Sequence, residues 1–488
     1  MPHLWGRRPD LTLAWSSTDT IAIGICLVVA SLLHGWRIGE PNALVYDEVT
    51  YVGEAFQYLR REAFFELHPP LAILLTAAAI RIFGCYAWGW RIASATLGTA
   101  LVPITYLLAR RMFNSRLAGA IASTLVLCDG MFLIYSRLAL INIAYLTFGA
   151  AAYLMLLRFI QSDDRLSRRR TLVWIGIALG LGLASKFAVP GIAWLLTVGF
   201  LLLFVTGERL EADAGRTERD LRRSRARRAF GVVALVGGVS AICYFAVFLP
   251  HFWLGWWSGL EDLIANYRQM MSFNSAFLDR GQTQFDSPWW SWPLMLRPYK
   301  YWGEVLSHGQ SREIWGGGNP AIWWGALIGI SLAMIRALRH GDWSWCFLIT
   351  GYLAYTAMWV PIQRVLYQYS YMPALFLAIL ALAGMLECCW GERTQWWEQI
   401  ALLLPIAAAG LLGLGWLLGT FSIVLIGAGY LLARLRANAG GRFVCALFLA
   451  TTVILFFYFL PIWTALPMSR SQLAARMWLS GGHIANWW

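Results

Sequence analysis

Charged residues are scarce in this chain. Asp, Glu, Lys and Arg make up only 13% of its 488 residues, whereas hydrophobic residues make up 59%. A soluble domain carries roughly twice that charged fraction, so the composition excludes a soluble globule. The apolar residues gather in runs of roughly 17 to 25, the length that crosses about 30 Å of hydrocarbon as a helix. The sequence therefore predicts one polytopic, all-α membrane domain over residues 1–488.

Other absences narrow the chemistry. The eight cysteines lie mostly inside apolar runs, without the spacing of a zinc site or a disulfide framework. The chain has no Walker A motif, and no dinucleotide fingerprint placed after a strand. We therefore expect no metal and no cofactor. Any activated donor would be delivered through the bilayer.

Lysine is almost absent, so the net charge of +13 comes from arginine. The arginines concentrate in short connections, most densely at 206–228, which is the pattern of the positive-inside rule rather than of nucleic-acid binding. Arg7 and Arg8 then place the N-terminus in the cytoplasm, with no cleaved signal segment. The long segments 38–90 and 250–318 fall on the external side.

This arrangement corresponds to about 11 to 13 transmembrane helices with two long external loops. The expected spans are 19–36, 91–109, 117–134, 139–158, two flanking Ser185–Lys186, 229–249, 320–335, one ending near 361, 371–386, 400–417, 419–433 and 443–462. The apolar run after Pro70 is closed early by Arg81, so we interpret it as a helix lying in the outer interface. A true span there is the alternative, and it would invert everything downstream.

Asp47 and Glu48 are adjacent carboxylates in the first external loop. Consecutive side chains diverge by about 100° in a helix, so one can face a site while the other orients a neighbour. A carboxylate in this position can act as a general base on an alcohol or help to hold a metal. A solvated pair without function is the alternative.

Three cations are expected at the same depth. Arg91 opens a span, Arg137 lies in an outer turn, and Lys186 is one of only two lysines. Charges near membrane depth are functional candidates by default, and together these suit a phosphate-bearing lipid. For each cation alone, the alternative is a side chain that snorkels at a helix end.

Two further motifs have ordinary structural explanations. His68 precedes Pro69 and Pro70, and its imidazole could simply hydrogen-bond the loop. Asn319 precedes Pro320, a pattern typical of a loop that ends where a helix begins.

Several segments, in order along the chain, resemble the protein O-mannosyltransferases, polytopic glycosyltransferases of the GT-C class. They are YDEVTYVGEAFQYL, FFELHPPLAILL, WRIASATLGTALVPITYLLARRMF, DGMFLIYSRLALIN, GIALGLGLASKFA, SPWWSWPLMLRPYKYW, GGGNPAIWW and PIWTALPMSRSQLAARMWL. The resemblance implies an inverting transfer of mannose from polyprenyl-phosphate mannose to Ser or Thr hydroxyls of exported proteins. The secretion translocon is left open as a further partner.

The resemblance also implies roles for residues. Asp47 would be the general base, Glu48 its essential neighbour, and Arg91 a required basic residue. Arg137 and Lys186 match basic positions that would bind the lipid phosphate together with Arg91. Five supporting residues complete the expected site: His68, Asn142, Arg297, Asn319 and Arg364.

The chain departs from the family pattern in three ways. Asn142 stands where the family usually has Asp, and the second loop reads GQTQFDSPWW without the histidine often found before this tryptophan motif. The β-trefoil insert of eukaryotic members is absent, and two extra spans lie near 400–433. The last departure points to a bacterial enzyme. Together with the arginine pattern, it predicts a protein of the cytoplasmic (inner) membrane with its active site outside.

Two other functions stay open. One is a GT-C transferase that uses another polyprenyl-phosphate sugar, or a lipid or glycan acceptor. The other is a transporter or flippase, for which we would expect paired internal repeats with broken helices at the midplane; none is evident in the sequence.

Overall fold

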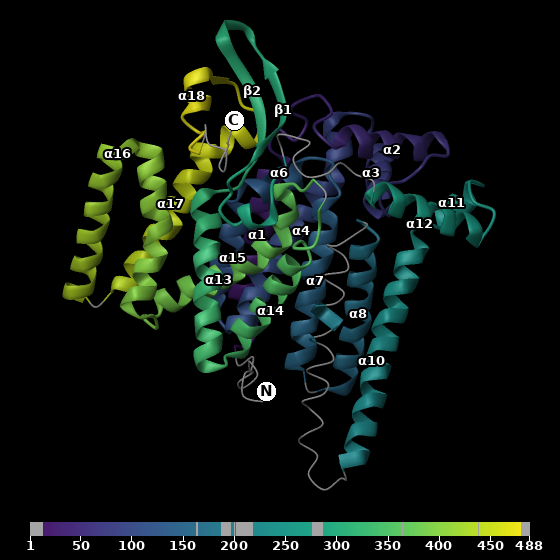
Figure 1. Ribbon diagram of the computed structural model, residues 1–488, viewed down its shortest axis with the longest axis horizontal. Helices are drawn as coiled ribbons and strands as arrows, with labels where there is room; N and C mark the ends of the chain where they lie inside the picture. The colour runs from purple at the N-terminus through teal and green to yellow at the C-terminus, as the bar shows by residue number, and fades with distance from the viewer. Residues whose placement is uncertain are drawn as a thin grey trace.

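The computed structural model describes residues 13–162, 164–186, 197–199, 201, 218–275, 286–363, 365–437 and 439–479. Arg364 therefore lies outside the described residues. Helices dominate the described chain and run roughly alongside one another as a bundle, with a β-hairpin standing beyond one end (Figure 1).

Eight helices in the described ranges are long and apolar enough to cross a membrane. They are α1 (Ser17–Gly35), α4 (Ala87–Phe113), α7 (Asn142–Gln161), α10 (Glu218–Ala246) continued by α11 (Leu249–Trp253), α13 (Pro320–His340), α15 (Met372–Trp390) with η3 (Gln368–Tyr371) before it, α16 (Trp396–Ala437) and α17 (Gly440–Trp463). A ninth span is possible if α5 (Arg116–Leu127) and α6 (Gly130–Arg137), bent by 66°, form one broken crossing.

The expected count of about 11 to 13 included helices that are too charged or too short to be counted, and most of the expected span after Lys186 lies outside the described residues. α8 (Arg165–Leu183) packs between α7 and α10 but has four arginines among its first six residues, and α14 (Trp343–Ala357) has only 15 residues. α3 (Leu71–Phe83) has 13 residues, about 20 Å of helix, which is shorter than the hydrocarbon layer. The predicted short helix after Pro70 is therefore present.

The two predicted runs near 400–433 form the two arms of α16. Gly415 breaks the helix with φ of 76°, a conformation that glycine adopts at little cost. A Cβ atom added to Gly419 would lie 2.6 Å from the Cα of Leu411, so the second arm folds back against the first (Figure 1).

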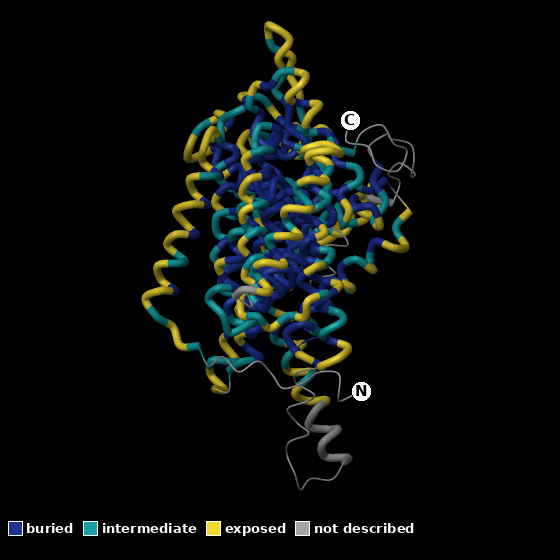
Figure 2. Tube along the Cα trace, turned by 90° about the vertical axis from the view of Figure 1, so that its left-hand side faces the viewer, coloured by how far each residue is buried: buried dark blue, intermediate teal, exposed yellow. Residues whose placement is uncertain are grey.

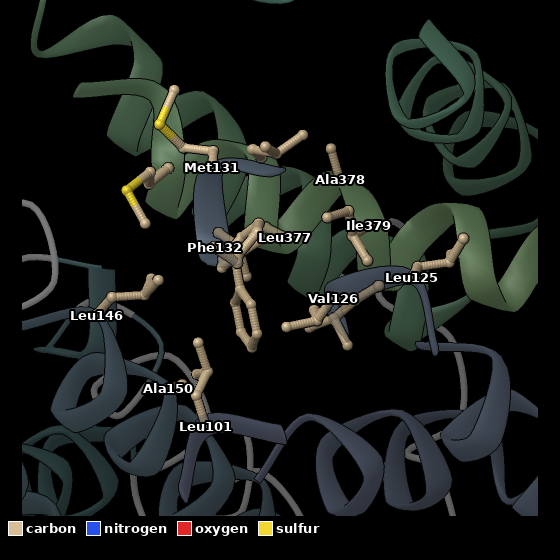
Figure 3. Close-up of a cluster of buried hydrophobic side chains, with 14 of the residues drawn as sticks. Leu101, Leu125, Val126, Met131, Phe132, Leu146, Ala150, Leu377, Ala378 and Ile379 are labelled. Atoms are coloured by element: carbon tan, nitrogen blue, oxygen red, sulfur yellow. The ribbon is translucent and has the colours of Figure 1, made fainter. Parts of the chain in front are cut away.

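The core follows α15, whose residues are almost all buried. Side chains of α4, α5, α6 and α7 meet it, among them Leu101, Val126, Phe132 and Ala150 around Leu377 (Figure 3). Buried residues run along the bundle axis, whereas the hairpin tip is exposed (Figure 2). Apolar packing between helices thus fixes the frame that carries the loops.

One end of the bundle is held by buried ion pairs. Asp19, at the start of α1, accepts hydrogen bonds from Tyr106, from Arg110 near the end of α4, and from Arg116 at the start of α5. At this same end, Arg111 near the end of α4 donates to Gln161, the last residue of α7. The connection after α4 and the end of α7 therefore lie at the same end of the bundle. Most of the predicted basic loop 206–228 lies outside the described residues.

The opposite end carries the two long segments. The first contains α2 (Glu48–Arg60) and α3; the second contains α12 (Leu260–Ser275), η1 (Trp289–Ser291), β1 (Tyr299–Val305), η2 (Ser307–Gly309) and β2 (Gln310–Gly316). β3 (Met468–Ser469), followed by α18 (Arg470–Ala474), completes an antiparallel sheet of order β1-β2-β3. The mostly helical fold is as predicted. The small sheet was not predicted from the sequence; its strands β1 and β2 lie in the segment 250–318, which was expected only to be an external loop.

Candidate functional site

The two carboxylates at the start of α2 diverge as predicted. Asp47 is the N-cap residue and Glu48 the first residue of the helix. Tyr46, just before them, has φ of 53°, a left-handed conformation that is uncommon for a residue other than glycine. Such a backbone conformation persists only where the surrounding structure holds it. Here the stacking of Tyr46 on Tyr301, described below, holds it.

Glu48 is fully buried and accepts four hydrogen bonds. Arg91 donates from Nε to Oε1 and from Nη2 to Oε2, both at 2.8 Å. The backbone N–H groups of Val45 and Ala139 donate at 2.9 and 2.8 Å. The carboxylate thereby joins the first loop to the start of α4 and to the turn after α6, so it is anchored rather than exposed to a substrate.

Arg91 uses all five of its N–H donors on the protein. Besides Glu48, it donates to the carbonyl oxygens of Ile38, Pro41 and Ala43, at 2.8 to 3.0 Å. The side chain is fully buried. These contacts do not support the predicted phosphate contact, because no N–H group of Arg91 remains for an added anion; they define a clamp on the loop 38–48.

Arg137 is similarly engaged. Its guanidinium donates to the carbonyls of Leu33, Trp36 and Arg37, at the C-terminal end of α1. Cations are favoured at that end of a helix, where carbonyl groups lack intrahelical partners. The predicted role at a lipid phosphate is not supported by these contacts either.

Of the two carboxylates, Asp47 is the one that Lys186 lies near. It follows α8 and donates from Nζ to Oδ1 of Asn142 at 2.6 Å, with the ring of Tyr369 4.9 Å away. The N–H of Leu71 at the start of α3 donates to the carbonyl of Ala184, which joins the two loops here. Because Asn142 is neutral, it orients Lys186 without cancelling its charge.

Asp47 has an unusual protonation equilibrium for an aspartate. Burial raises its pKa and the positive charge of Lys186 lowers it, with a net value of about 6. The carboxylate is therefore mostly ionised at neutral pH, yet more basic than a solvated aspartate. That combination suits a general base.

Tyrosines from four segments surround this point. Tyr46 stacks on Tyr301 of β1 with centroids 4.7 Å apart, and meets Tyr369 edge-on at 6.5 Å. Tyr135 of α6 lies 2.9 Å from Tyr301, oxygen to oxygen. Sequence reasoning missed this cluster. One signal was the alternation of tyrosines in PYKYW, which places them on one side of an extended strand. YQYSY instead folds mostly as η3, so its alternation carries no such signal.

The supporting residues have mixed outcomes. His68 is buried near the ring of Tyr51, 6.2 Å between centroids, on the α2 side of the site. Arg297 donates to the carbonyl of Asp286. Asn319 caps α13, as its sequence context indicated. It also donates to the carbonyls of Cys128 and Thr452 and so ties helices together, which the sequence did not predict.

A second buried cluster links the two long segments. Glu66 accepts from Tyr58 and lies 3.1 Å from Nε2 of His251 in α11. Burial and the charge of Glu66 raise the pKa of nearby Glu54 to about 8. The described residues include no group of three or more His, Cys, Asp or Glu arranged to hold a metal ion.

The fold and this site define a glycosyltransferase of the GT-C class. The structure of the Saccharomyces cerevisiae protein O-mannosyltransferase Pmt1–Pmt2 complex bound to the sugar donor aligns with a TM-score of 0.76, covering 96% of this chain and 93% of that one at 16% identity. ArnT from Cupriavidus metallidurans, bound to undecaprenyl phosphate, aligns with a TM-score of 0.53 over 91% of this chain and 77% of its own, at 17% identity.

Within that class, the chain belongs to the protein O-mannosyltransferase family. Residues 24–88 and 82–255 match the dolichyl-phosphate-mannose-protein mannosyltransferase family, and 259–481 match the C-terminal four-transmembrane region of protein O-mannosyltransferase. A polyprenol-phosphate-mannose–protein mannosyltransferase of Mycolicibacterium smegmatis is 26% identical over 77% of this chain and 83% of its own length. The Mycobacterium tuberculosis protein of that name is 25% identical over 71% and 77%.

Proposed function

We propose that this enzyme transfers mannose from polyprenyl-phosphate mannose to Ser or Thr hydroxyls of exported polypeptides. The observation that carries the proposal is the placement of Asp47, with a pKa near 6, beside Lys186 and among tyrosines, within a chain of this family. The named relatives support the donor and the protein acceptor.

The chemistry follows from the charges. The acceptor oxygen attacks C1 of mannose as Asp47 takes the hydroxyl proton, and the bond from C1 to the phosphate oxygen breaks. Its electron pair leaves with polyprenyl phosphate, whose charge Lys186 stabilises. Attack opposite the phosphate inverts the anomeric carbon.

The remaining residues act by positioning. Glu48 holds Arg91, and Arg91 holds the carbonyls of loop 38–48, so that Asp47 keeps its direction. Arg137 fixes the end of α1 against α6 in the same way. We thus assign the phosphate to Lys186, and Arg91 and Arg137 to the frame around it.

The test is Asp47→Asn in purified protein given polyprenyl-phosphate mannose and a Thr-containing peptide. The amide keeps size and hydrogen bonding but loses basicity, so turnover at saturating donor should fall about 10²- to 10⁴-fold while the donor still binds. Asp342→Asn, which alters only the N-cap of α14, is the matched control. Turnover of Asp47→Asn within about twofold of wild type would remove Asp47 as the base.

The same assay separates the other functions. A transferase for another sugar would use a different polyprenyl-phosphate donor, and one for lipids or glycans would leave the peptide unmodified. A transporter would release no lipid phosphate. Activity that resists chelators is expected, because Lys186 rather than a metal ion meets the phosphate.

A further inference from the structure

β1 has one open edge. It pairs with β2 from Tyr299 opposite Gly316 to Val305 opposite Ser311, and the described part of the chain places no strand along its other side. An open edge presents unpaired N–H and C=O groups, which proteins usually cover, shorten or disrupt. β1 is therefore able to accept another extended chain.

The strand leads from solvent to the site. At its inner end Tyr299 and Tyr301 are buried, and Tyr301 stacks on the residue next to Asp47. At its outer end Gly303 and Glu304 are exposed, and Val305 is 86% exposed. Four residues of strand span about 13 Å.

A β-bulge redirects the side chains at the inner end of β1. The register skips Tyr301 between Lys300 and Trp302, and such a bulge bends a strand and redirects its side chains. A Cβ atom on Gly316, which pairs with Tyr299, would lie 2.3 Å from the Tyr301 ring, so the position of that ring requires a glycine there. Burial together with the charge of Asp47 raises the pKa of Tyr301, which is consistent with their proximity.

We propose that the open edge of β1 binds the acceptor polypeptide, which adds to the sheet as an extended strand and carries its hydroxyl to Asp47. This deepens the proposed function and rests on it. Strand addition takes its affinity from main-chain hydrogen bonds, so it specifies an extended backbone and leaves side chains largely free. Only the hydroxyl residue that faces Asp47 has to be Ser or Thr.

The first experiment uses the alternation of main-chain hydrogen bonds along a β-strand. In a β-ladder only every second residue of the added chain bonds the edge. We compare an eight-residue peptide with one central Thr against two versions that are N-methylated on alternate residues, one for each set. One methylated set should raise KM about tenfold or more, since each methyl removes a main-chain bond, while the other set stays within about twofold.

The second experiment tests whether the bound peptide lies along β1. In a Cys85→Ser background, which removes an exposed native thiol, Val305→Cys should form a disulfide with a peptide whose cysteine lies four residues from Thr. Two peptides, with the cysteine before or after Thr, report the strand direction. Gln310→Cys, on β2 beside β3, is the control and should capture neither.

The outcomes separate the two proposals. Equal KM for all three peptides, or equal capture by both cysteine variants, would overturn acceptor binding at β1 while transfer itself continues. Disulfide formation between two copies through Val305→Cys, without peptide capture, would assign the edge to an interface between copies. Absence of transfer to the unmodified peptide would instead count against the proposed function.

Discussion

At the scale of single residues, the setting of Asp47 shows how a carboxylate is made basic without losing its charge. Burial favours the protonated form and Lys186 favours the ionised form, which leaves the pKa near 6. Asn142 contributes by being neutral: it holds Lys186 at 2.6 Å and leaves the positive charge to act on Asp47.

The pH profile follows from this balance. Because the base form of Asp47 exists above its pKa, kcat/KM should fall about tenfold per unit as pH drops below about 6. Asn142→Asp adds a negative charge beside Lys186, which raises the pKa of Asp47 and moves this limb to higher pH. The measurement is kcat/KM from pH 4.5 to 8.5, with Tm recorded at each pH to exclude unfolding. A limb centred below pH 4.5, or unmoved in Asn142→Asp, would contradict the assignment.

Glu54 predicts a stability effect. Its pKa is about 8 in the folded protein and near 4.5 as a free side chain, so folding favours its protonated form and stability falls as pH rises from about 4.5 to 8. Glu54→Gln removes this dependence. The Tm of the variant relative to wild type should rise by several degrees between pH 5 and pH 8.5 in thermal unfolding in detergent.

Exposed Glu62→Gln is the control and should show no such change. An unsatisfied amide in Glu54→Gln would shift Tm by the same amount at every pH. The result therefore depends only on how the difference in Tm between variant and wild type changes with pH. A difference that stays equal at both pH values would show that Glu54 is ionised throughout.

At the scale of elements, the first loop, 38–48, is held in place by one buried ion pair. Glu48 and Arg91 are 43 residues apart in sequence and both fully buried, and their hydrogen bonds reach loop 38–48, α4 and the turn after α6. Removing one partner of such a pair costs roughly 3 to 5 kcal/mol, because the other charge is left buried. The start of α2, and Asp47 with it, depends on this pair.

Arg91→Lys separates positioning from phosphate binding. Lysine keeps the charge but loses the bidentate contact and most of the carbonyl contacts, so Tm and kcat should both fall while the Kd for the donor changes by less than about threefold. Lys186→Met should show the opposite split, with the Kd for the donor raised at least about tenfold and Tm nearly unchanged.

Arg336→Lys is the matched control. Arg336, near the C-terminal end of α13, donates to both carboxylate oxygens of Glu398, as Arg91 does to Glu48. It should lower Tm without changing kcat at a temperature where the variant is folded. An Arg91→Lys protein with normal Tm and weakened donor binding would return Arg91 to the phosphate site.

At the scale of the whole molecule, the two ends of the bundle differ in kind. One end gathers arginine-rich connections around Asp19, and the other carries α2, α3 and the hairpin (Figure 1). By the positive-inside rule we expect the first end to face the cytoplasm and the site to face outward, where a donor in the outer leaflet and an exported chain would meet.

Labelling with a membrane-impermeant thiol reagent tests this orientation. In a Cys85→Ser background, Val305→Cys on the hairpin should label in intact cells, whereas Arg228→Cys on α10 should label only after permeabilisation. Both positions are exposed in the folded chain, so accessibility does not distinguish them. The reverse pattern would place the active site in the cytoplasm.

The sequence by itself determined the membrane class, the clustering of arginines in connections, the adjacent carboxylates and the short helix after Pro70. Each of these is a local property: run length, the charge of a connection, or spacing along one helix. Tertiary structure decided which charge meets which. Arg91 and Arg137 proved to hold backbone carbonyls, and the tyrosines around Asp47 come from Tyr46, α6, β1 and η3. Contacts between distant segments depend on how the helices pack, and a guanidinium can satisfy carbonyls as well as phosphate, so residue type alone could not assign these partners.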